Sequence, residues 1–571
     1  MCGIVGYAGR QEALPLLLAG LAKLEYRGYD SAGVAVQEPE GLAVVKAEGR
    51  LAHLTEHING QRFTGTVGIG HTRWATHGQP SDENAHPHLD CRGEIAVVHN
   101  GIIENYQELG RWLRERGHIF RSQTDTEVLP HLIEEFYQGD LLLAVSRALE
   151  KVKGSYALAA LHRREPGRIV VARQDSPLVV GLGQEENLVA SDIPALLSHT
   201  RRVYVLEDGE LAAVTPEAVQ VFDRQGRPVK KPVLEVQWDV AMAEKGGYED
   251  FMLKEIHEQP RALRDTLAGR LGEGGEVSLD EVKLTTLQVS RLRKIAVVAC
   301  GTAYHAGLVG KYVLEQLVRL PVEVDLASEF RYRRPLIDAD TLAVVISQSG
   351  ETADTLAGLR EAKRAGCRVV AITNVVGSSV AREADDVIYT WAGPEIAVAS
   401  TKAYLTQLIA LYLLALYLGQ RRGTIPATQA AEVAAGLRTL PSGVEAVLAR
   451  AEEVKELARQ YKDREDVFFI GRGLDYAVAM EGALKLKEIS YIHAEAYAAG
   501  ELKHGTLALI ERGVPVIALA TQGALREKMI SNMKEVKARE ATVIALAPEG
   551  AEEVAEAADH VLFLPQRPDF L

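Results

Sequence analysis

The sequence predicts an α/β protein in two parts: a layered sandwich up to about residue 235, and doubly wound α/β architecture from about residue 290. In the first part, short apolar runs alternate with turn residues, which is typical of strands, and two segments have helical spacing. In the second part, the order of strand, glycine turn and helix is repeated along the chain. With 571 residues the chain has room for roughly two to four domains.

The elements of the first part follow from these patterns. We expect strands within 65–76, 93–103, 153–162, 167–174 and 201–214, and helices within 12–26 and 126–138. The segment 236–260 then changes character, with a Gly-Gly step and mixed charge. We therefore expect a first domain over 1–239, followed by a linker with lead-in helices over 240–289.

The second part is expected to be a duplication. KIAVVACGTA (294–303) resembles DVFFIGRGLD (466–475), and two later strand segments match at nearly the same shift of 172–174 residues. This predicts two similar subdomains, over 290–425 and 460–571. The first copy continues into a long helix after EADDVIYT, whereas the second has only PQRPDFL after AADHVLFL. We therefore expect the second copy to lack its final helix and C-terminal tail.

Composition and charge narrow the class of protein. A hydrophobic content of 47% and a charged content of 25% are typical of soluble globular proteins, and a net charge of −14 argues against a nucleic-acid partner. No signal peptide is recognisable, and the four cysteines have no paired spacing. We expect the apolar run 403–419 to be a buried core helix rather than a membrane span, and the protein to be cytoplasmic.

The chain begins MCGIVGYAG, which places a cysteine directly behind the initiator methionine. Methionine before a small residue is usually removed, which would leave Cys2 with a thiol and a free α-amine. An α-amine has an unperturbed pKa of about 7.7–8.0, so it can accept the thiol proton at working pH. The first residues therefore predict a nucleophilic cysteine that carries its own base.

Three further segments could complete a site around Cys2: HTRWATHG (71–78), VVHNGIIEN (97–105) and SQTDTE (122–127). A cysteine that transfers acyl groups needs donors aimed at the developing oxyanion, and the Asn100 side chain with the Gly101 N–H can supply them. An amino-acid substrate needs an arginine for its carboxylate and an acid for its ammonium group. Arg73 and Asp125 fit these tasks, although each alone could equally form a surface ion pair.

One segment raises the question of a metal. NAHPHLDC (84–91) contains two histidines, an aspartate and a cysteine in eight residues. The spacing is not that of a usual structural zinc site, and no second pair of ligands follows nearby. We expect an ordered loop beside the active site and no metal.

The first-domain motifs resemble, in order, those of the N-terminal-nucleophile glutamine amidotransferase family. They are MCGIVGY, LEYRGYDSAG, HTRWATHG, VVHNGIIEN and TDTE. The resemblance implies a four-layer αββα sandwich in which Cys2 attacks the side-chain amide of glutamine and ammonia leaves. It assigns Asn100 and Gly101 to the oxyanion hole and Trp74 to the gating of ammonia. The residues that it implies for holding glutamine are Arg73, Thr76, His77 and Asp125.

In the second part, an apolar strand is followed by SQSGET and a helical run (341–356). Helix N-termini bind anions through free N–H groups, and the hydroxyls and the amide of this loop add donors. Because no Walker-type lysine is present, a small phosphomonoester fits better than a nucleoside triphosphate. A plain serine-rich helix cap is the alternative. The donors in this loop are Ser347, Gln348, Ser349 and Thr352.

The segment 479–490 should be helical, with Glu481, Lys485 and Glu488 on one face. A solvated stripe of ion pairs would look the same, but His504 follows in a glycine-flanked turn. A carboxylate, a lysine and a histidine near a phosphosugar would suit ring opening and proton transfer. GRGLDYA (471–477) lacks the context of a dinucleotide site, so we expect no NAD and no other cofactor.

SQSGET, VASTK (398–402), the segment 481–505 and the duplication resemble the paired sugar-isomerase (SIS) domains of isomerizing aminotransferases. The resemblance implies two doubly wound parallel SIS subdomains and a reaction in which fructose 6-phosphate accepts ammonia and becomes glucosamine 6-phosphate. It places phosphate on the SQSGET loop, with Thr302 and Ser400 near the sugar. It makes Glu488 the base, assisted by Lys485. It also implies a homodimer, in which the neighbouring subunit supplies His504 for ring opening.

Two alternatives stay open. Another amidotransferase with the same first domain, such as one that builds phosphoribosylamine, is disfavoured because SQSGET replaces an acidic pyrophosphate-binding strand end. A sugar-phosphate-sensing regulator would also carry SIS domains, but its attached domain would bind DNA or a partner. Here the attached domain carries Cys2, Asn100 and Asp125.

Overall fold

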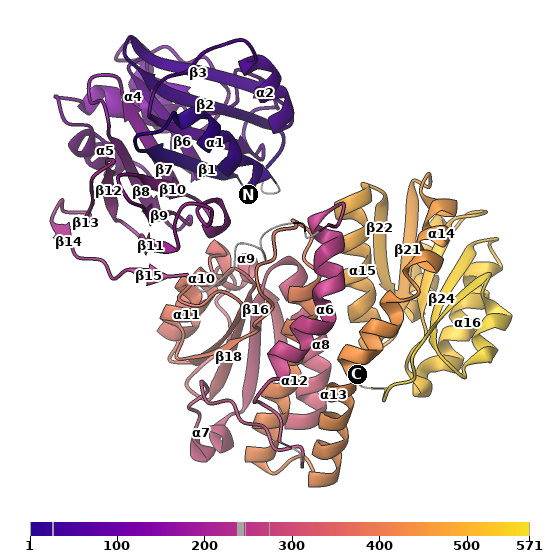
Figure 1. Cartoon of the computed structure of the whole chain (residues 1–571). Helices are drawn as coiled ribbons and strands as arrows, with labels where there is room; N and C mark the ends of the chain where they lie inside the picture. The colour runs from indigo at the N-terminus through magenta and orange to yellow at the C-terminus, as the bar shows by residue number, and fades with distance from the viewer. Residues whose placement is uncertain (1, 26–27, 237–244, 246, 273, 570–571) are drawn as a thin grey trace. The chain divides into compact units, whose positions relative to one another are not determined.

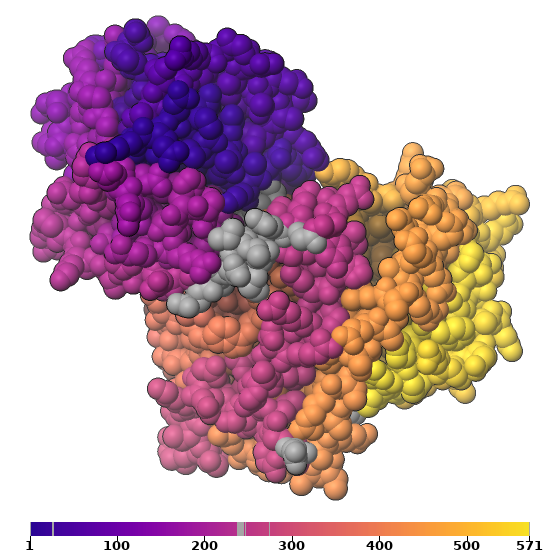
Figure 2. All heavy atoms as spheres, in the orientation of Figure 1, coloured from indigo at the N-terminus to yellow at the C-terminus, as the bar shows by residue number. Residues whose placement is uncertain are grey.

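The structure is a computed structural model that describes residues 2–25, 28–236, 245, 247–272 and 274–569 (Figures 1 and 2). The chain forms two compact units, residues 1–244 and 245–571. The domain boundary expected between residues 239 and 240 lies outside the described residues.

Unit 1 contains two antiparallel sheets. In the described residues, one has eight strands in the order β15-β11-β9-β10-β1-β4-β2-β3, and the other has seven in the order β14-β13-β12-β8-β7-β6-β5. The strands are β1 (Gly3–Ala8), β2 (Ser31–Glu38), β3 (Gly41–Glu48), β4 (Val67–Arg73), β5 (His88–Leu89), β6 (Ile95–Ile103), β7 (Gly154–His162), β8 (Ile169–Gln174), β9 (Val179–Leu182), β10 (Asn187–Ala190), β11 (Arg202–Val205), β12 (Leu211–Val214), β13 (Val219–Phe222), β14 (Pro228–Val229) and β15 (Leu234–Glu235). The helices are α1 (Ala13–Ala22), α2 (Leu51–Ile58), α3 (Tyr106–Arg114), α4 (Val128–Phe136), α5 (Leu141–Leu149) and the 3-10 helix Ile193–Ala195.

Three apolar cores divide unit 1 into four layers. One lies between the two sheets, where side chains such as Ile4 and Ile69 meet Val98 and Leu161. A second joins α1 and α2 to the outer face of the eight-stranded sheet, and a third joins α3, α4 and α5 to the seven-stranded sheet. The predicted αββα sandwich is confirmed (Figure 1).

The run 201–214, expected as one strand, forms two. β11 belongs to the eight-stranded sheet and β12 to the seven-stranded sheet. The break falls at Asp208-Gly209, where Gly209 has φ +84°, a backbone conformation that favours glycine. The chain therefore crosses from one sheet to the other at this turn.

Unit 2 contains two parallel sheets with α/β connections. Within the described residues each has five strands, in the orders β17-β16-β18-β19-β20 and β22-β21-β23-β24-β25. The strands are β16 (Lys294–Ala299), β17 (Val322–Leu326), β18 (Thr341–Ser347), β19 (Arg368–Thr373), β20 (Asp386–Tyr389), β21 (Asp466–Gly471), β22 (His493–Ala498), β23 (Pro515–Leu519), β24 (Thr542–Pro548) and β25 (His560–Leu564). The helices are α6 (Phe251–Leu267), α7 (Thr286–Arg291), α8 (Gly301–Val318), α9 (Ala327–Phe330), α10 (Ala353–Arg364), α11 (Ser379–Glu383), α12 (Lys402–Arg422), α13 (Ala427–Leu448), α14 (Ala451–Tyr461), α15 (Leu474–Ser490) and α16 (Arg526–Lys537), with 3-10 helices at Ala499–His504, Thr506–Leu509, Gly523–Leu525 and Glu552–Ala557.

The two sheets have the same strand order, and the strands that match in sequence occupy the same places in it. The predicted duplication is therefore confirmed, with both copies doubly wound. Strands such as β18 are buried along their whole length because helices cover both faces of a parallel sheet.

Helix α12 corresponds to the apolar run 403–419. It is long and apolar enough to cross a membrane, but 83% of its most apolar 18-residue window is buried inside the protein. Leu411, Leu414 and Leu418 lie in the core of the first sheet with residues of α8. The expected core helix is confirmed.

Candidate functional site

Cys2 lies directly before β1, the strand that pairs with β4 on one side and β10 on the other. Its Sγ accepts a hydrogen bond of 3.2 Å from the Trp74 backbone N–H, just beyond the end of β4. The next residue has to be glycine, because a Cβ on Gly3 would lie 2.6 Å from the Thr72 hydroxyl oxygen. The central strand pair thus fixes the thiol beside the start of the 74–78 loop.

Asn100 of β6 is turned toward Cys2. Its Nδ2 donates to the Cys2 carbonyl oxygen at 2.9 Å, and its Oδ1 lies 2.9 Å from His71 Nε2. Gly101 has φ +133°, and a Cβ there would lie 2.1 Å from the Ser155 carbonyl oxygen. The structure therefore brings together the thiol and the amide donor that the sequence proposed for one site.

His71 determines how the Asn100 amide is oriented. Burial lowers the pKa of His71 to about 3, so its ring is neutral at working pH. Its Nε2 faces two oxygen acceptors, Asn100 Oδ1 and the His99 carbonyl at 3.1 Å, so Nε2 carries the proton. The ring then holds Oδ1, which leaves the donor Nδ2 pointing at Cys2.

Arg73 is a buried cation with unused donor capacity. Its Nη2 donates to the His77 and Gly78 carbonyl oxygens, whereas its buried Nη1 has no hydrogen-bond partner among the described residues. Burial lowers the pKa of Arg73, and the charges of Cys2, Asp30 and Asp125 act in the opposite direction. A guanidinium with a free donor is suited to bind a carboxylate.

Asp125 precedes α4 and is 4% exposed. Its Oδ2 accepts from the Ile103 N–H at 2.8 Å, and its Oδ1 lies 4.0 Å from His77 Nδ1. His77 Nδ1 is also 3.3 Å from the Thr76 hydroxyl. Trp74 is 41% exposed, with its ring edge-on to Tyr29 at 5.5 Å between centroids. The residues that were predicted to hold the substrate glutamine therefore lie together around the 74–78 loop.

Three supporting side chains in unit 1, those of His71, Asp30 and His86, were not predicted as site residues. Asp30 Oδ2 accepts from the Ala75 N–H at 2.7 Å and so fixes the loop that begins at Trp74. His86 stacks on His71 with 4.0 Å between ring centroids, and its Nδ1 accepts from the His99 N–H at 3.2 Å. Asp30 and His71 stand inside the quoted motifs, but only the strand pairing shows what they contact.

The SQSGET loop of unit 2 joins β18 to α10. The Ser347 hydroxyl accepts from the Gly350 N–H and lies 3.0 Å from the Thr352 hydroxyl. Gly350 has φ +67°, and a Cβ there would lie 2.0 Å from the Ser378 hydroxyl oxygen. None of the described side chains caps the N-terminus of α10, so its N–H groups stay open to an anion.

A polar network joins α15 to α8. The Lys485 ammonium donates to the Thr302 hydroxyl at 3.0 Å, and that hydroxyl donates to Glu481 Oε1 at 2.9 Å. Lys485 also donates to Glu488, so it lies between the two carboxylates of its helix face. His305 of α8, which the sequence analysis did not select, is 2.7 Å from Glu481 Oε2. Helix α15 comes from the second copy and α8 from the first.

Two of the residues predicted to bind or act on the sugar lie outside this network in the described part of the chain. The Ser400 hydroxyl donates to Glu395 at 2.7 Å, and Glu395 also accepts from the Thr401 and Ala403 N–H groups at the start of α12. His504 is exposed at the end of the 3-10 helix Ala499–His504 and makes no hydrogen bond with Lys485 or Glu488.

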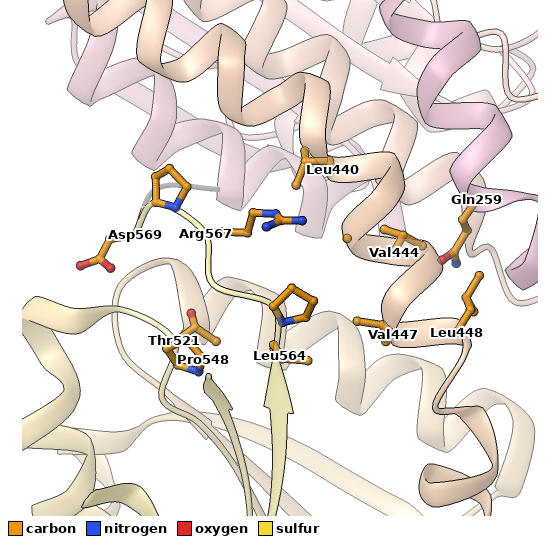
Figure 3. A pocket seen from close by; sticks show the side chains of 13 residues that line it. Gln259, Leu440, Val444, Val447, Leu448, Thr521, Pro548, Leu564, Arg567 and Asp569 are labelled. Atoms are coloured by element: carbon orange, nitrogen blue, oxygen red, sulfur yellow. The ribbon is translucent and has the colours of Figure 1, made fainter. Parts of the chain in front are cut away.

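A separate cavity of about 280 Å³ lies in unit 2 between α13 and the residues after β25 (Figure 3). Its walls are mainly apolar side chains such as Leu440, Val444 and Leu564, with Arg567 at one side. None of the predicted sugar-phosphate residues is among its lining residues in the described chain. We therefore place no substrate there.

Comparison with known proteins identifies two kinds of domain, one in each unit. The glutamine amidotransferase domain model matches residues 71–198, and the SIS domain model matches 288–417 and 460–570. The glutamine–fructose-6-phosphate aminotransferase (isomerizing) of Symbiobacterium thermophilum is 60% identical over 567 residues, with 99% of this chain and 93% of that protein covered. The chain belongs to this aminotransferase family. The protein of the same name from Clostridium tetani is 57% identical, with the same coverage.

A solved structure supports the fold of unit 2. The C-terminal domain of glucosamine-fructose-6-phosphate aminotransferase from Francisella tularensis matches with a TM-score of 0.55 and 42% sequence identity. The match covers 57% of this chain and 92% of that domain. The predicted pair of SIS subdomains is confirmed by this likeness and by the two matches of the SIS model.

Proposed function

We propose that the chain catalyses the reaction for which its relatives are named, the glutamine-dependent amination of fructose 6-phosphate with isomerisation, with one half-reaction in each unit. In unit 1, after removal of Met1, the α-amine of Cys2 takes the thiol proton and Sγ adds to the side-chain amide carbon of glutamine. The amide nitrogen gains a proton and leaves as ammonia, and water then hydrolyses the thioester to glutamate and free thiol.

The donors around Cys2 support this chemistry. Asn100 Nδ2, together with the Gly101 N–H, stabilises the oxyanion that forms at the amide oxygen. The free Nη1 of Arg73 binds the α-carboxylate of glutamine and Asp125 binds its ammonium group, with Thr76 and His77 beside them. Trp74, bonded to Cys2 through its backbone, gates the release of ammonia. The observation that carries this half is the Asn100 amide held against Cys2.

In unit 2, the phosphate of fructose 6-phosphate binds to the hydroxyls of Ser347, Ser349 and Thr352, to Gln348 and to the open N-terminus of α10. Thr302 and Ser400 lie near the sugar. Glu488 moves the proton between sugar carbons, and Lys485, which donates to it, assists. The exposed His504 opens the sugar ring in the site of a second chain of the same protein, so the active assembly is a homodimer.

We further propose that this homodimer is cytoplasmic and has neither a nucleic-acid nor a membrane partner. The net charge of −14 supports the first exclusion, because binding to the many phosphates of a nucleic-acid backbone requires basic patches. The burial of most of the α12 window supports the second.

Replacement of Cys2 by alanine tests unit 1. Glutamate release from glutamine should fall by orders of magnitude, whereas calorimetric binding of fructose 6-phosphate should not change. Cys367→Ser, which removes a buried thiol in unit 2, serves as the control and should keep its glutaminase activity. Intact-mass analysis of active enzyme should show that Met1 is absent, and an active enzyme that keeps Met1 would contradict the mechanism.

A triple replacement of Ser347, Ser349 and Thr352 by alanine tests unit 2. A hydrogen bond to a charged group is worth about 1.5–3 kcal/mol, so the loss of three should weaken fructose 6-phosphate binding by several orders of magnitude. Basal glutaminase activity should stay nearly unchanged. Unaltered sugar-phosphate binding, measured by calorimetry, would rule out this site.

A further inference from the structure

Four metal-ligating side chains meet on unit 1, outside the glutamine site. Cys91 follows β5, His118 lies in the loop after α3, and His131 and Glu134 stand three residues apart on α4. One ligand atom from each residue lies within 4.8 Å of the others. Cys91 is exposed, whereas the side chains of His118 and His131 are 8% and 1% exposed.

Four of the six distances between these ligand atoms are close to those of a tetrahedral site. Cys91 Sγ is 3.5 Å from His118 Nδ1 and 3.4 Å from His131 Nδ1. Glu134 Oε2 is 3.3 Å from His118 Nδ1 and 3.8 Å from His131 Nδ1. Tetrahedral zinc with Zn–S of about 2.3 Å and Zn–N or Zn–O of about 2.0–2.2 Å has ligand–ligand edges of about 3.3–3.7 Å.

The outer nitrogens of both rings face carboxylates. His118 Nε2 is 3.3 Å from Glu135 Oε2, so that nitrogen carries the proton. His131 Nε2 is 3.7 Å from Glu127 Oε1, which is beyond hydrogen-bond distance, and has no hydrogen-bond partner in the part of the chain that the structure describes. His118 therefore has the arrangement of a metal-bound histidine, in which a carboxylate accepts from one ring nitrogen and the other binds the metal, and the outer nitrogen of His131 is turned toward a carboxylate in the same way.

With the ring protons on Nε2, lone pairs outnumber protons at the centre of the cluster. Both Nδ1 atoms and Glu134 Oε2 are then acceptors, and the Cys91 thiol has a single proton to share. The Cys91 backbone N–H donates to Oε2 at 3.2 Å, and Arg92 lies 3.4 Å from the other carboxylate oxygen, so both hold the carboxylate in place from outside the cluster. A cation at the centre would satisfy all four ligand atoms at once.

We propose that Cys91, His118, His131 and Glu134 bind one zinc ion. Thiolate and imidazole ligands favour zinc over calcium or magnesium, which take oxygen ligands. Four protein ligands leave no open position, so the role is structural rather than catalytic. The proposal departs from the expectation of no metal, because only Cys91 belongs to the 84–91 segment and its co-ligands lie 27 to 43 residues further along the chain.

The zinc would hold α4 to the strand edge beside the glutamine site. Glu127, the carboxylate behind His131, also accepts from the Arg121 and Ser122 N–H groups and from the Ser122 hydroxyl. These bonds close the loop that carries Asp125. The metal would therefore stabilise this loop through His131 and Glu127, without contact with the reacting atoms.

Metal analysis of the full chain, purified without an affinity tag and incubated with zinc sulfate before desalting, tests the proposal. We expect about one zinc per chain in the wild type and loss of this zinc in Cys91→Ser and His118→Asn. Cys367→Ser and His57→Asn are matched controls, since they remove a thiol and an exposed histidine elsewhere, and both should keep the zinc. Circular dichroism checks that each variant is folded.

Cobalt substitution provides a second readout that does not depend on activity. Cobalt(II) bound at the site should give a thiolate-to-cobalt charge-transfer absorption in the wild type and in both controls, and Cys91→Ser should lack it. Removal of zinc by a chelator should lower the Tm of the wild type but not that of Cys91→Ser. A wild-type chain that binds no zinc, or equal zinc in wild type and Cys91→Ser, would overturn the proposal.

Discussion

The side-chain amide of Asn100 is oriented by a histidine that does not face the thiol. His71 is neutral because burial lowers its pKa to about 3, and its single ring proton goes to the nitrogen that faces Asn100. A ring with its proton on Nδ1, or a rotated ring, would not donate to the amide oxygen. His71 is therefore a positioning residue, and its effect should appear in the rate rather than in the binding of glutamine.

Replacement of His71 by alanine should lower the glutaminase kcat by about tenfold to a hundredfold and leave KM within about twofold. Loss of a whole oxyanion donor costs about 10²–10³ in kcat, and the effect here should be smaller because the Asn100 amide is misplaced rather than removed. His71→Gln keeps an N–H donor and should restore part of the rate. His57→Ala, on the exposed side of α2, is the control. A large rise in KM at constant kcat would contradict the positioning role.

For Arg73 we expect the opposite effect, a change in KM rather than in kcat. Its free Nη1 has no partner among the described residues, and lysine cannot reproduce the forked geometry of a guanidinium. Arg73→Lys should raise the KM for glutamine by about tenfold to a hundredfold, as expected for the loss of about 1.5–3 kcal/mol of charged hydrogen bonding. Arg10→Lys, at an exposed ion pair, is the matched control. Steady-state glutaminase kinetics at several glutamine concentrations measure both.

At the scale of elements, the strand–loop–helix unit β18–α10 depends on one backbone conformation. Gly350 turns the SQSGET loop with a positive φ, and the Ser378 hydroxyl fills the space where a Cβ would be. The Ser347 hydroxyl accepts from the Gly350 N–H. Any shift of this glycine moves the hydroxyls that are proposed to bind phosphate.

Gly350→Ala should therefore weaken fructose 6-phosphate binding by more than about tenfold, because the loop must move to admit the methyl group. Gly423→Ala is a close control: its φ of +69° imposes a similar backbone strain, but nothing lies within 4 Å of the added Cβ. Calorimetry with fructose 6-phosphate compares the two variants. Equal losses of affinity would show that strain in general, and not this loop, is responsible.

Most elements could be predicted from the sequence because their signals are local. The apolar run of α12 and the glycine turn after β18 are each contained in about twenty residues. The roles of His71 and His305 could not be predicted, since they depend on strand register and on the contact of α8 with α15. The zinc ligands were missed for the same reason. The break of 201–214 was visible as Asp208-Gly209, a turn signal inside an apolar run.

At the scale of the whole molecule, a buried carboxyl ties α6 to the chain before α12 in unit 2. Glu255 is 2% exposed and accepts from the Ile396 and Ala397 N–H groups. Burial, with a contribution from Glu395, raises the pKa of Glu255 to about 7, while the two backbone N–H groups and then Lys402 act in the opposite direction. The folded state therefore binds a proton more tightly than the unfolded state, whose pKa for this group is about 4.5.

The stability of unit 2 should therefore fall as the pH rises from about 4.5 to about 7 and stay low above it. A pKa unit corresponds to about 1.4 kcal/mol, so the contribution is on the order of 3 kcal/mol. Glu255→Gln should flatten this dependence, and Glu432→Gln, an exposed change on α13, should not. Urea unfolding at pH 5 and pH 8 measures the difference, and an equal pH dependence in wild type and Glu255→Gln would exclude Glu255 as its source.

The contact between α8 and α15 joins groups from the two copies of the repeat in one network. The first copy contains the turn after β18 that is proposed to bind phosphate, and the second contributes the lysine and carboxylates of α15, so neither contains the whole set of groups. By this assignment, a chain with the first copy alone would keep the proposed phosphate site but lack the groups proposed to transform the sugar, and a chain with the second copy alone would lack the phosphate site. The two copies are therefore complementary, and removal of either one would take away part of the proposed site.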